Sequence, residues 1–284
     1  MRVAVTGAAG FVGGAITAHL REHGHDVTPL TRREWDITAG PFDLRVDAVV
    51  HCAALADDTA PLGQAMLVNR IGTRNVVASA AGARIVHVST SSVYDAFVPS
   101  VEVREDTPLP TRYLSSYSES KAAAEGELPT DAVVLRPHAV YGPGDTTLLP
   151  RVLAGIRGSR LVLPEGARVR HTLTHVENLA AAAALALTGP AGVYNVGDDT
   201  DVLLSAVLTE FLARRGRPDV TLHSIPYRAA FAAAAVAERL QRRPRLTRYA
   251  VSQLGLERTL DLTRARELLG YEPGPTSLVG AEQW

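Results

Sequence analysis

The feature that most constrains this chain is a glycine-rich segment, Thr6–Gly13 (TGAAGFVG), between a strand-like run and a helix-like run. Arg2–Thr6 is short and rich in β-branched residues, and Phe11–His23 has the apolar spacing of an amphipathic helix. Glycines permit a tight turn and let the backbone approach a phosphate, whose charge is attracted by the N–H groups of a helix N-terminus. This arrangement predicts a dinucleotide-binding unit. The residues predicted to contact the dinucleotide are Gly7, Gly10, Phe11, Val12 and Gly13.

Strand-like and helix-like segments alternate through the first half of the chain. Further strands are expected at His25–Leu30, Val46–Cys52, Ala83–Ser89 and Ala132–Leu135, and further helices at Gln64–Ala80 and Glu119–Glu127. Such alternation is typical of an α/β fold with a Rossmann-type, doubly wound parallel sheet. After about residue 142 it becomes irregular. Residues 1–142 are therefore predicted to form the dinucleotide-binding domain and 143–284 mainly a smaller C-terminal substrate-binding region, with segments around 172–198 returning to the first domain.

The end of the second expected strand carries the signal for cofactor choice. An acidic residue about 20 positions beyond the glycines would bind the adenosine ribose of NAD. This chain instead has Arg32 and Arg33, and a guanidinium can hold the 2′-phosphate of NADP with two hydrogen bonds. The arginines favour NADP, with NAD as the alternative because Glu34 follows directly. Asp36 and Ile37 are expected to lie along the adenine.

Tyr117 and Lys121 lie four residues apart at the start of an expected helix, so both side chains would share one face. The pKa of a free tyrosine is about 10, and a nearby ammonium lowers it. A phenol tuned in this way can exchange a proton with a carbonyl or an alcohol while a nicotinamide carries the hydride. The run Val88–Tyr94 (VSTSSVY) ends a strand at the same sheet edge, where a hydroxyl could bind the substrate oxygen.

These segments resemble the extended (atypical) short-chain dehydrogenase/reductase family, also described as NAD-dependent epimerases/dehydratases. The resemblance covers nearly the whole chain. The family patterns TGxxGFxG, VNxxGTxNV, YxxxK and LRPxxVYGPG are matched by Thr6–Gly13, Val68–Val76, Tyr117–Lys121 and Leu135–Gly144, and its later signatures by Thr174–Ala180, Tyr194–Gly197 and Asp261–Pro273.

The resemblance implies a role for each matched residue. Tyr117 would be the general acid/base, and Lys121 would bind the nicotinamide ribose and lower the pKa of Tyr117. Thr90, or Ser91 as the alternative, would be the catalytic hydroxyl, and Asn69 would order the active site beside the cofactor. The other cofactor contacts that the resemblance implies are Ala53, Ala54, Val88, Pro137, His138 and Val140.

Departures from the family patterns indicate the reaction. Ser91 and Ser92 stand where sugar-nucleotide 4,6-dehydratases carry Asp and Glu, and His171 stands where sugar-nucleotide enzymes usually carry a phosphate-binding Arg. The C-terminal tail resembles the 3β-hydroxysteroid dehydrogenase-like branch. We therefore expect an NADPH-dependent ketoreductase or alcohol dehydrogenase for a small or apolar substrate. A sugar-nucleotide epimerase or 4-ketoreductase is the alternative, and a catalytically silent dinucleotide sensor is a third interpretation.

The amino-acid composition limits the kinds of partner that we expect the protein to bind. The 29 basic and 30 acidic residues nearly cancel, which argues against nucleic acid or an anionic membrane as a partner. Cys52 is the only cysteine, so no metal site is predicted. No signal-peptide pattern and no run of 18 apolar residues is found, so we expect a cytoplasmic protein. Small residues in the expected helix 64–80 allow close packing, so we expect a homodimer, with a monomer as the alternative.

Overall fold

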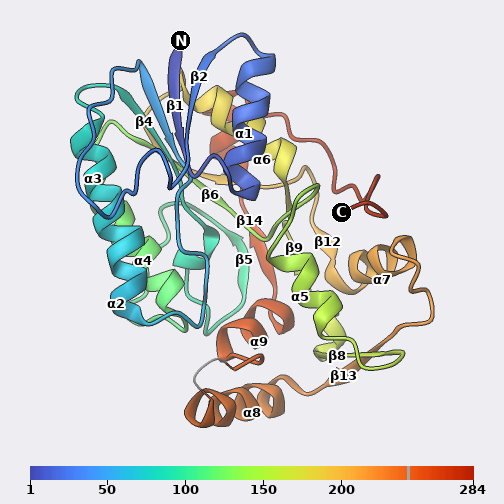
Figure 1. The fold of residues 1–284 in the computed structure, drawn as a ribbon. Coiled ribbons are helices and arrows are strands. Elements are labelled where there is room, and N and C mark those ends of the chain that lie inside the picture. The colour runs from blue at the N-terminus through green and yellow to red at the C-terminus, as the bar shows by residue number, and fades with distance from the viewer. Residues whose placement is uncertain (242–243) are drawn as a thin grey trace.

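A six-stranded parallel sheet forms the centre of the molecule in the computed structural model, which describes residues 1–241 and 244–284 (Figure 1). Its strand order is β2-β1-β3-β4-β6-β11, and each neighbouring pair is parallel. The predicted Rossmann-type α/β sheet is therefore confirmed. The strands are Arg2–Thr6 (β1), Asp26–Leu30 (β2), Ala48–His51 (β3), Arg84–Val88 (β4), Val133–Pro137 (β6) and Gly192–Val196 (β11).

Helices cover both faces of this sheet (Figure 1). On one face, α1 (Phe11–Glu22) and α6 (Val176–Ala186) lie side by side. On the other face lie α2 (Leu62–Ala65), α3 (Gly72–Ser79) and α4 (Ser116–Glu125). The central strands therefore have no face toward water, which explains why they are almost continuously apolar rather than alternating.

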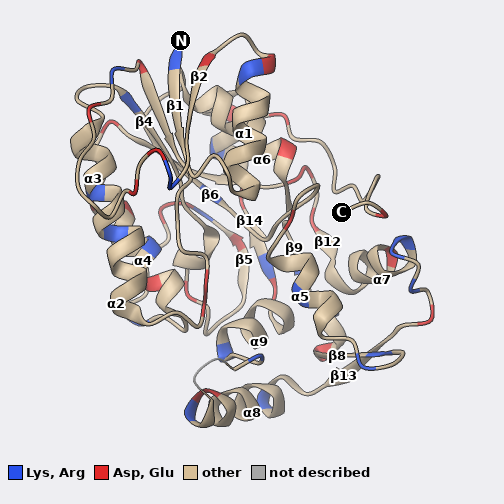
Figure 2. Ribbon diagram, viewed as in Figure 1, with Lys and Arg blue, Asp and Glu red and all other residues tan. Residues whose placement is uncertain are grey.

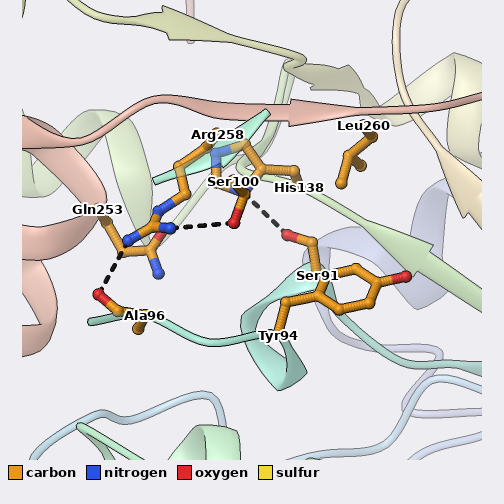
Figure 3. Close-up of a pocket in the computed structure, with 8 residues that line it drawn as sticks. All are labelled: Ser91, Tyr94, Ala96, Ser100, His138, Gln253, Arg258 and Leu260. Atoms are coloured by element: carbon orange, nitrogen blue, oxygen red, sulfur yellow. Dashed lines mark hydrogen bonds between the residues drawn. The ribbon is translucent and has the colours of Figure 1, made fainter. Parts of the chain in front are cut away.

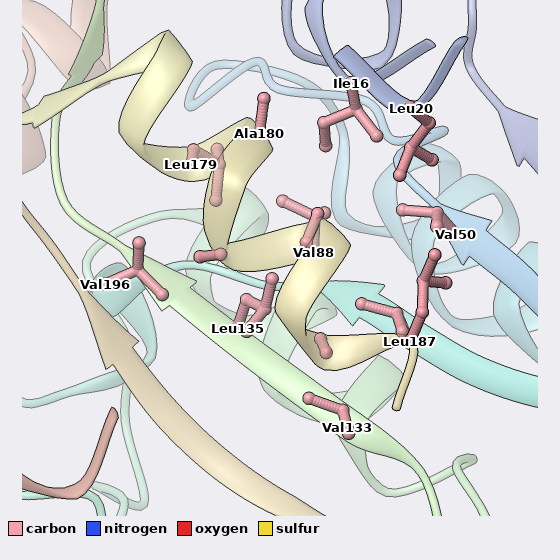
Figure 4. Packing of buried hydrophobic residues seen from close by; sticks show 14 of the residues in the cluster. Ile16, Leu20, Val50, Val88, Val133, Leu135, Leu179, Ala180, Leu187 and Val196 are labelled. Atoms are coloured by element: carbon pink, nitrogen blue, oxygen red, sulfur yellow. The ribbon is translucent and has the colours of Figure 1, made fainter. Parts of the chain in front are cut away.

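Strand β1 shows how the sequence fills these two layers. Val3 and Val5 are fully buried in a cluster that includes Leu20 of α1, part of which Figure 4 shows. Ala4 lies between them in the chain and belongs to the opposite cluster, with Val76 of α3. Successive residues of a strand point to opposite faces, so each side chain of this short run is placed in one core or the other.

The helix predicted at residues 64–80 differs most from the expectation. It begins at Leu62, and its middle, Met66–Ile71 (η1), is a π-helix. The other predicted helices and strands of the first half are present, with bounds shifted by only a few residues. Single π-helical turns inside α-helices often mark functional sites.

A second lobe is built largely from the C-terminal half (Figure 1). Its four-stranded sheet has the order β12-β9-β14-β5, formed by Val202–Leu203, Arg170–His171, Arg258–Leu260 and Ser100–Val103. Parallel pairs are formed by Arg160–Pro164 (β8) with Thr221–Ile225 (β13), and by Val140–Tyr141 (β7) with Thr174–His175 (β10). Besides α6, the α-helices of this half are α5 (Leu148–Ala154), α7 (Leu204–Arg214), α8 (Tyr227–Leu240), α9 (Arg248–Gly255) and α10 (Thr263–Leu269).

The chain passes between the two lobes more than once. Strand β5 comes from the first half but pairs with β14 of the small sheet. Helix α6 and strand β11 come from the second half but complete the large sheet and its covering layer. The edge between the lobes is therefore lined by segments that are far apart in the sequence.

Acidic and basic residues are interspersed over both lobes (Figure 2). Across residues 1–241 and 244–284, no helix is both long and apolar enough to cross a membrane. In the same residues, no three His, Cys, Asp or Glu side chains are grouped so as to hold a metal ion.

Candidate functional site

The glycine-rich turn meets the loop that follows β3 at the carboxyl edge of the sheet. Gly7 has a φ of +70°, and a Cβ there would lie 2.7 Å from the backbone nitrogen of Ala53. A Cβ on Gly13 would lie 2.2 Å from the carbonyl oxygen of Gly7. Both positions therefore require glycine. Strand β1 lies between β2 and β3, so this turn sits where the winding of the sheet reverses, which is where doubly wound folds bind dinucleotides.

The start of α1 fits the pyrophosphate of such a dinucleotide. Gly10 is the N-cap of the helix, and no side chain in the described part of the molecule caps it. The first N–H groups of a helix have no partner within the helix and carry a partial positive charge. Phe11, Val12 and Gly13 therefore offer backbone donors beside a turn whose glycines leave room for phosphate oxygens.

Arg32 and Arg33 lie exposed in the turn after β2, at the end of the site where the adenosine would lie. Arg32 pairs with Asp36, at 3.1 Å between Nε and Oδ2. Glu34 accepts a hydrogen bond from the backbone nitrogen of Thr31 at 2.9 Å, so its carboxylate belongs to its own turn. The arginines are therefore the charged groups that a 2′-phosphate would meet there.

Ile37 is held between this turn and α3. A Cβ on Gly72 would lie 2.6 Å from the Cδ1 atom of Ile37, so the helix can approach only because residue 72 is glycine. Asn75 donates a hydrogen bond to the carbonyl oxygen of Ile37 at 2.7 Å. These contacts fix the segment that was predicted to lie along the adenine.

Asn69 is buried in the π-helical segment and fastens two parts of the site together. Its Oδ1 accepts from the backbone nitrogen of Leu55 at 2.7 Å, and its Nδ2 donates to the carbonyl oxygen of the same residue at 3.2 Å. The Nδ2 group also donates to the hydroxyl of Ser120 at 2.8 Å. Asn69 therefore ties the loop after β3 to α4, the helix that carries Tyr117 and Lys121.

Lys121 is the only lysine among the 29 lysines and arginines of the chain. It is 2% exposed, and its Nζ donates to the Nε2 of His87 at 3.0 Å and to the carbonyl oxygen of Val88 at 2.9 Å. An ammonium has three N–H donors, so among the described residues one donor is left for a ligand. Burial lowers the pKa of Lys121 to about 8, and nearby Glu125 opposes this shift.

His87 and His51 form a buried pair beneath Lys121, with ring centroids 5.1 Å apart. Desolvation holds the pKa of His87 well below its ordinary value, so the ring is neutral and accepts from the ammonium. Burial and the Lys121 charge lower the pKa of His51 to about 3. The Nδ1 of His51 contacts the Thr6 hydroxyl at 2.7 Å, and its Nε2 contacts the Thr73 hydroxyl at 3.0 Å.

Tyr117 lies one turn before Lys121 on α4 and is half-buried. Burial raises the pKa of Tyr117, and a hydrogen bond with the Thr90 side chain opposes this rise. The resemblance implied that Lys121 lowers this pKa, whereas the chain by itself raises it. The physical reason for the rise is the desolvation of the phenol, and two donors of the Lys121 ammonium are bonded to His87 and Val88.

Ser91 is bonded into a different chain of side chains (Figure 3). Its Oγ lies 2.9 Å from the Nδ1 of His138, and the Nε2 of His138 lies 3.0 Å from the Nδ1 of His171. Pro137 ends β6 and Val140 forms β7 on either side of this histidine. Thr90 is thus the hydroxyl beside Tyr117, while Ser91 is tied to the C-terminal lobe.

Helix α9 brings residues to the site that sequence reasoning missed. The Tyr249 hydroxyl lies 2.7 Å from the Oγ of Ser92. Thr247 caps α9 and donates to Asp58 at 2.7 Å, and Arg151 of α5 pairs with the other oxygen of Asp58 at 2.8 Å. No local pattern signals these contacts, because they join residues 93 to 189 positions apart. Lys121, by contrast, was predicted, and its being the only lysine of the chain is a further signal in the sequence.

Comparison with known proteins agrees with this geometry. Residues 3–197 match the family model described as the NAD dependent epimerase/dehydratase family. The chain is 34% identical to a 4-hydroxy-2-methyl-3-oxo-4-farnesyl-3,4-dihydroquinoline-1-oxide ketoreductase of Stigmatella aurantiaca, over 95% of this chain and 92% of that protein. It is 31% identical to a 2-alkyl-3-oxoalkanoate reductase of Shewanella oneidensis, over 98% of this chain and 83% of that protein.

The fold is also found among solved structures. The dTDP-4-dehydrorhamnose reductase of Bacillus anthracis, in complex with NADP, superposes with a TM-score of 0.73 at 19% identity, covering 99% of this chain and 96% of that one. The sequence motifs, the glycine-rich turn and these similarities agree with one another. The chain therefore belongs to the NAD dependent epimerase/dehydratase family and is an NAD(P)-dependent oxidoreductase of the extended short-chain dehydrogenase/reductase type.

Proposed function

We propose that this protein reduces a ketone with NADPH, with Tyr117 as the proton donor. The observation that carries the proposal is the grouping of Thr90, Tyr117 and Lys121 at the carboxyl edge of the sheet, beside the glycine-rich turn. Two relatives that match nearly the whole chain are named as reductases of oxo compounds. For the remaining site residues we propose the roles that the family resemblance implies. Asn69 would order the active site, and the other matched residues would contact the cofactor.

A bound nicotinamide would supply the hydride in this reaction. The chain's own residues would bind the carbonyl oxygen through the hydroxyls of Thr90 and Tyr117. Because burial raises the pKa of Tyr117, the phenol is protonated at neutral pH and ready to donate. The Lys121 ammonium would bind the nicotinamide ribose through its remaining donor and favour the phenolate left after the proton has moved.

The substrate is proposed to be an apolar or small ketone rather than a sugar nucleotide. His171 stands at the usual place of a phosphate-binding arginine, and burial lowers its pKa to about 3, so it carries no charge for a phosphate. Neighbouring Arg170 is exposed and donates to the carbonyl oxygen of Asp201 at 3.3 Å. Substrate would bind between the sheet edge and the C-terminal lobe.

A sugar-nucleotide 4-ketoreductase or epimerase is the second candidate. A specific observation favours it: the dTDP-4-dehydrorhamnose reductase of Mycobacterium tuberculosis is 35% identical, although over only 50% of this chain. An epimerase keeps its cofactor through a full catalytic cycle, whereas a reductase releases the oxidised form. Exchange of the cofactor during turnover therefore separates an epimerase from both kinds of reductase.

The test is NADPH oxidation with 2-alkyl-3-oxo acids, α-hydroxyketones, plain alkyl ketones and dTDP-4-keto sugars, each also assayed with NADH. We expect turnover with the non-sugar ketones and a preference for NADPH that the double variant Arg32→Ala/Arg33→Ala loses. Turnover of the sugar nucleotide alone would establish the second candidate. A preference of the wild type for NADH would refute the choice of NADP.

Two further proposals concern the protein as a whole. A homodimer is supported by Leu62 and Leu67, which are 43% and 47% exposed on the helix that packs beside α4. Sedimentation velocity at micromolar concentration should show the dimer, and a monomer would refute it. The cytoplasmic location stays a prediction, and fractionation of the producing cell would test it.

A further inference from the structure

Arg258 of β14 is a buried cation that forms no ion pair with any carboxylate of the described residues. It is only 5% exposed. Its two terminal nitrogens donate to neutral oxygens, and four such contacts are with the carbonyls of Ala96 at 3.0 Å and Val98 at 2.7 Å and the hydroxyls of Ser100 at 3.0 Å and Ser252 at 2.6 Å. These bonds use the four N–H groups of the terminal nitrogens and leave the N–H group at Nε.

A buried charge is costly when no opposite charge lies beside it. Asp95 is the acidic residue whose charge acts on Arg258, but its carboxylate accepts from the backbone nitrogen of Phe97 at 2.8 Å. Desolvation lowers the pKa of Arg258 to about 10, so the guanidinium is still charged at neutral pH. The described residues therefore leave this positive charge without a counter-ion.

Unused polar atoms gather around the same charge. Of the five buried side-chain atoms in residues 1–241 and 244–284 that lack a hydrogen-bond partner, three are the Nε of Arg258, the Oε1 of Gln253 and the Nε2 of His171. His171 is the register partner of Arg258 in the small sheet, and Gln253 lies on α9. Buried polar atoms nearly always have a partner, so such a group points to a bound ion or molecule.

A small cavity lies where these elements meet (Figure 3). Arg258 and Gln253 line it together with Ser91 and His138, and no acidic side chain of the described residues lines it. The space is narrow, since a water-sized sphere fits in only a small part of its volume of about 260 Å³. It therefore has room for one small ion, and not for a cofactor or a sugar.

The cavity offers what an anion needs, which is positive charge together with N–H donors. The free N–H group of Arg258 belongs to the charged guanidinium. The Gln253 amide forms no hydrogen bond with a described residue, and its oxygen and nitrogen can exchange places by rotation, so its –NH₂ group can face the cavity. A water molecule would also bond these groups, but it would leave the charge of Arg258 unbalanced.

We propose that this cavity binds one small monovalent anion, of the size of chloride, between the Nε of Arg258 and the amide of Gln253. The anion is the counter-ion of Arg258 and ties α9 to β14. The same helix carries Tyr249, whose hydroxyl bonds Ser92 at the sheet edge, so the anion helps to hold this helix in place. The inference does not depend on the proposed ketone reduction.

The direct test is a crystal of the wild-type protein grown with sodium bromide, with diffraction measured at the bromine absorption edge. We expect an anomalous peak in the cavity, within hydrogen-bond reach of the Nε of Arg258 and the amide of Gln253. A water molecule in the cavity, with no anomalous peak there, would overturn the proposal.

The test in solution is urea unfolding in sodium chloride and in sodium gluconate at equal ionic strength. An anion that binds only the folded protein should lower the unfolding constant about elevenfold at a concentration of about ten times its dissociation constant. Equal stability of the wild type in the two salts would overturn the proposal, because gluconate is too large for the cavity.

A variant that carries its own anion locates the effect. Gln253→Glu places a carboxylate beside Arg258, so its stability should not change when chloride replaces gluconate. Gln283→Glu is the matched control, since Gln283 is exposed in the C-terminal tail, and it should respond to chloride as the wild type does. An undiminished chloride effect in Gln253→Glu would place the anion elsewhere and overturn the proposal.

Discussion

Two buried histidine pairs lie in the described part of the molecule, and they differ in what they connect. His51 and His87 have ring centroids 5.1 Å apart, as do His138 and His171. His51 and His87 are register partners on the neighbouring strands β3 and β4, wholly within the large sheet. His138 follows β6, while His171 lies on β9 of the small sheet, so this pair joins the two lobes.

The comparison shows that buried, neutral histidine pairs can have different roles in one molecule. In the sheet pair, His87 bonds the ammonium of Lys121, a group that the proposed mechanism needs for both proton transfer and cofactor binding. In the lobe-joining pair, His138 bonds the hydroxyl of Ser91, and His171 bonds His138 from the small sheet. Changes at His87 should therefore affect turnover of every substrate and cofactor binding, whereas changes at the second pair should affect how the C-terminal lobe meets the sheet edge.

Lys121→Met should have the largest effect on the sheet side. It removes the one ammonium at the site while keeping a side chain of similar length, so kcat should fall by roughly 10²-fold or more. The dissociation constant for NADPH should rise as well, because the same group would bind the nicotinamide ribose. Steady-state kinetics and cofactor fluorescence titration measure the two effects. Unchanged cofactor affinity would show that Lys121 does not reach the ribose.

His87→Leu should weaken the same group without removing it. The buried ammonium would keep only the carbonyl oxygen of Val88, so the pKa of Lys121 should fall below 8. The alkaline limb of the pH profile for kcat/KM should move to lower pH, and kcat/KM at pH 8 should fall roughly tenfold. His51→Gln is the matched control, since His51 bonds two threonines rather than Lys121. If the alkaline limb does not move in His87→Leu, then His87 does not influence the pKa of Lys121.

The pKa of Lys121 can be measured directly, since ¹³Cε-labelled lysine should give one resonance from this chain. We expect it to titrate near pH 8, against an ordinary value of 10.5. Between these values the unfolded chain binds more protons than the folded protein, so stability should rise with pH from about 8 until tyrosines titrate near 10. Denaturant unfolding should show this rise in the wild type and lose it in Lys121→Met. Titration at the ordinary value would contradict the burial described above.

Asp58→Asn should have the smallest effect. Its consequences should resemble those of changes at the lobe-joining pair, His138 and His171. The Asp58 side chain is 4% exposed and binds both Arg151 and Thr247, so it holds α5 and α9 to the loop after β3. Asn keeps the shape but loses the charge, so KM for the ketone should rise about threefold while NADPH affinity changes little. A larger loss of NADPH affinity than of ketone affinity would place this contact on the cofactor side.

The same two regions show how far sequence reasoning reaches. The strand–turn–helix unit was predictable because its glycines lie between a strand-like and a helix-like run, and Gly13 meets the backbone of Gly7 within the same turn. The contact of Gly7 with Ala53, after β3, is tertiary and could not be predicted. Tyr117 and Lys121 were predictable because four-residue spacing places them on one face of a helix. His51 and His87 lie in two of the expected strands, Val46–Cys52 and Ala83–Ser89. Their contact depends on the register of β3 against β4, which no local pattern encodes.

The C-terminal lobe was less predictable for a physical reason. His171, Tyr249 and Thr247 act through contacts with residues 33, 157 and 189 positions away, and each contact depends on how the two lobes pack. The π-helical segment at Met66–Ile71 was likewise missed, since the tie between Asn69 and Leu55 is a tertiary contact. The sequence also could not show that burial raises the pKa of Tyr117, or that Lys121 bonds His87 and Val88, because both depend on tertiary packing.

The most direct test of ketone reduction through Tyr117 is the single-turnover rate of NADPH oxidation in Tyr117→Phe, measured with a ketone that the wild type reduces. The variant removes only the phenolic hydroxyl, so the fold and NADPH binding should persist. Proton donation by a positioned group contributes roughly 10²–10⁴-fold, and the rate should fall by that order. A rate close to that of the wild type, with NADPH bound normally, would show that the proton comes from another group and would contradict the mechanism.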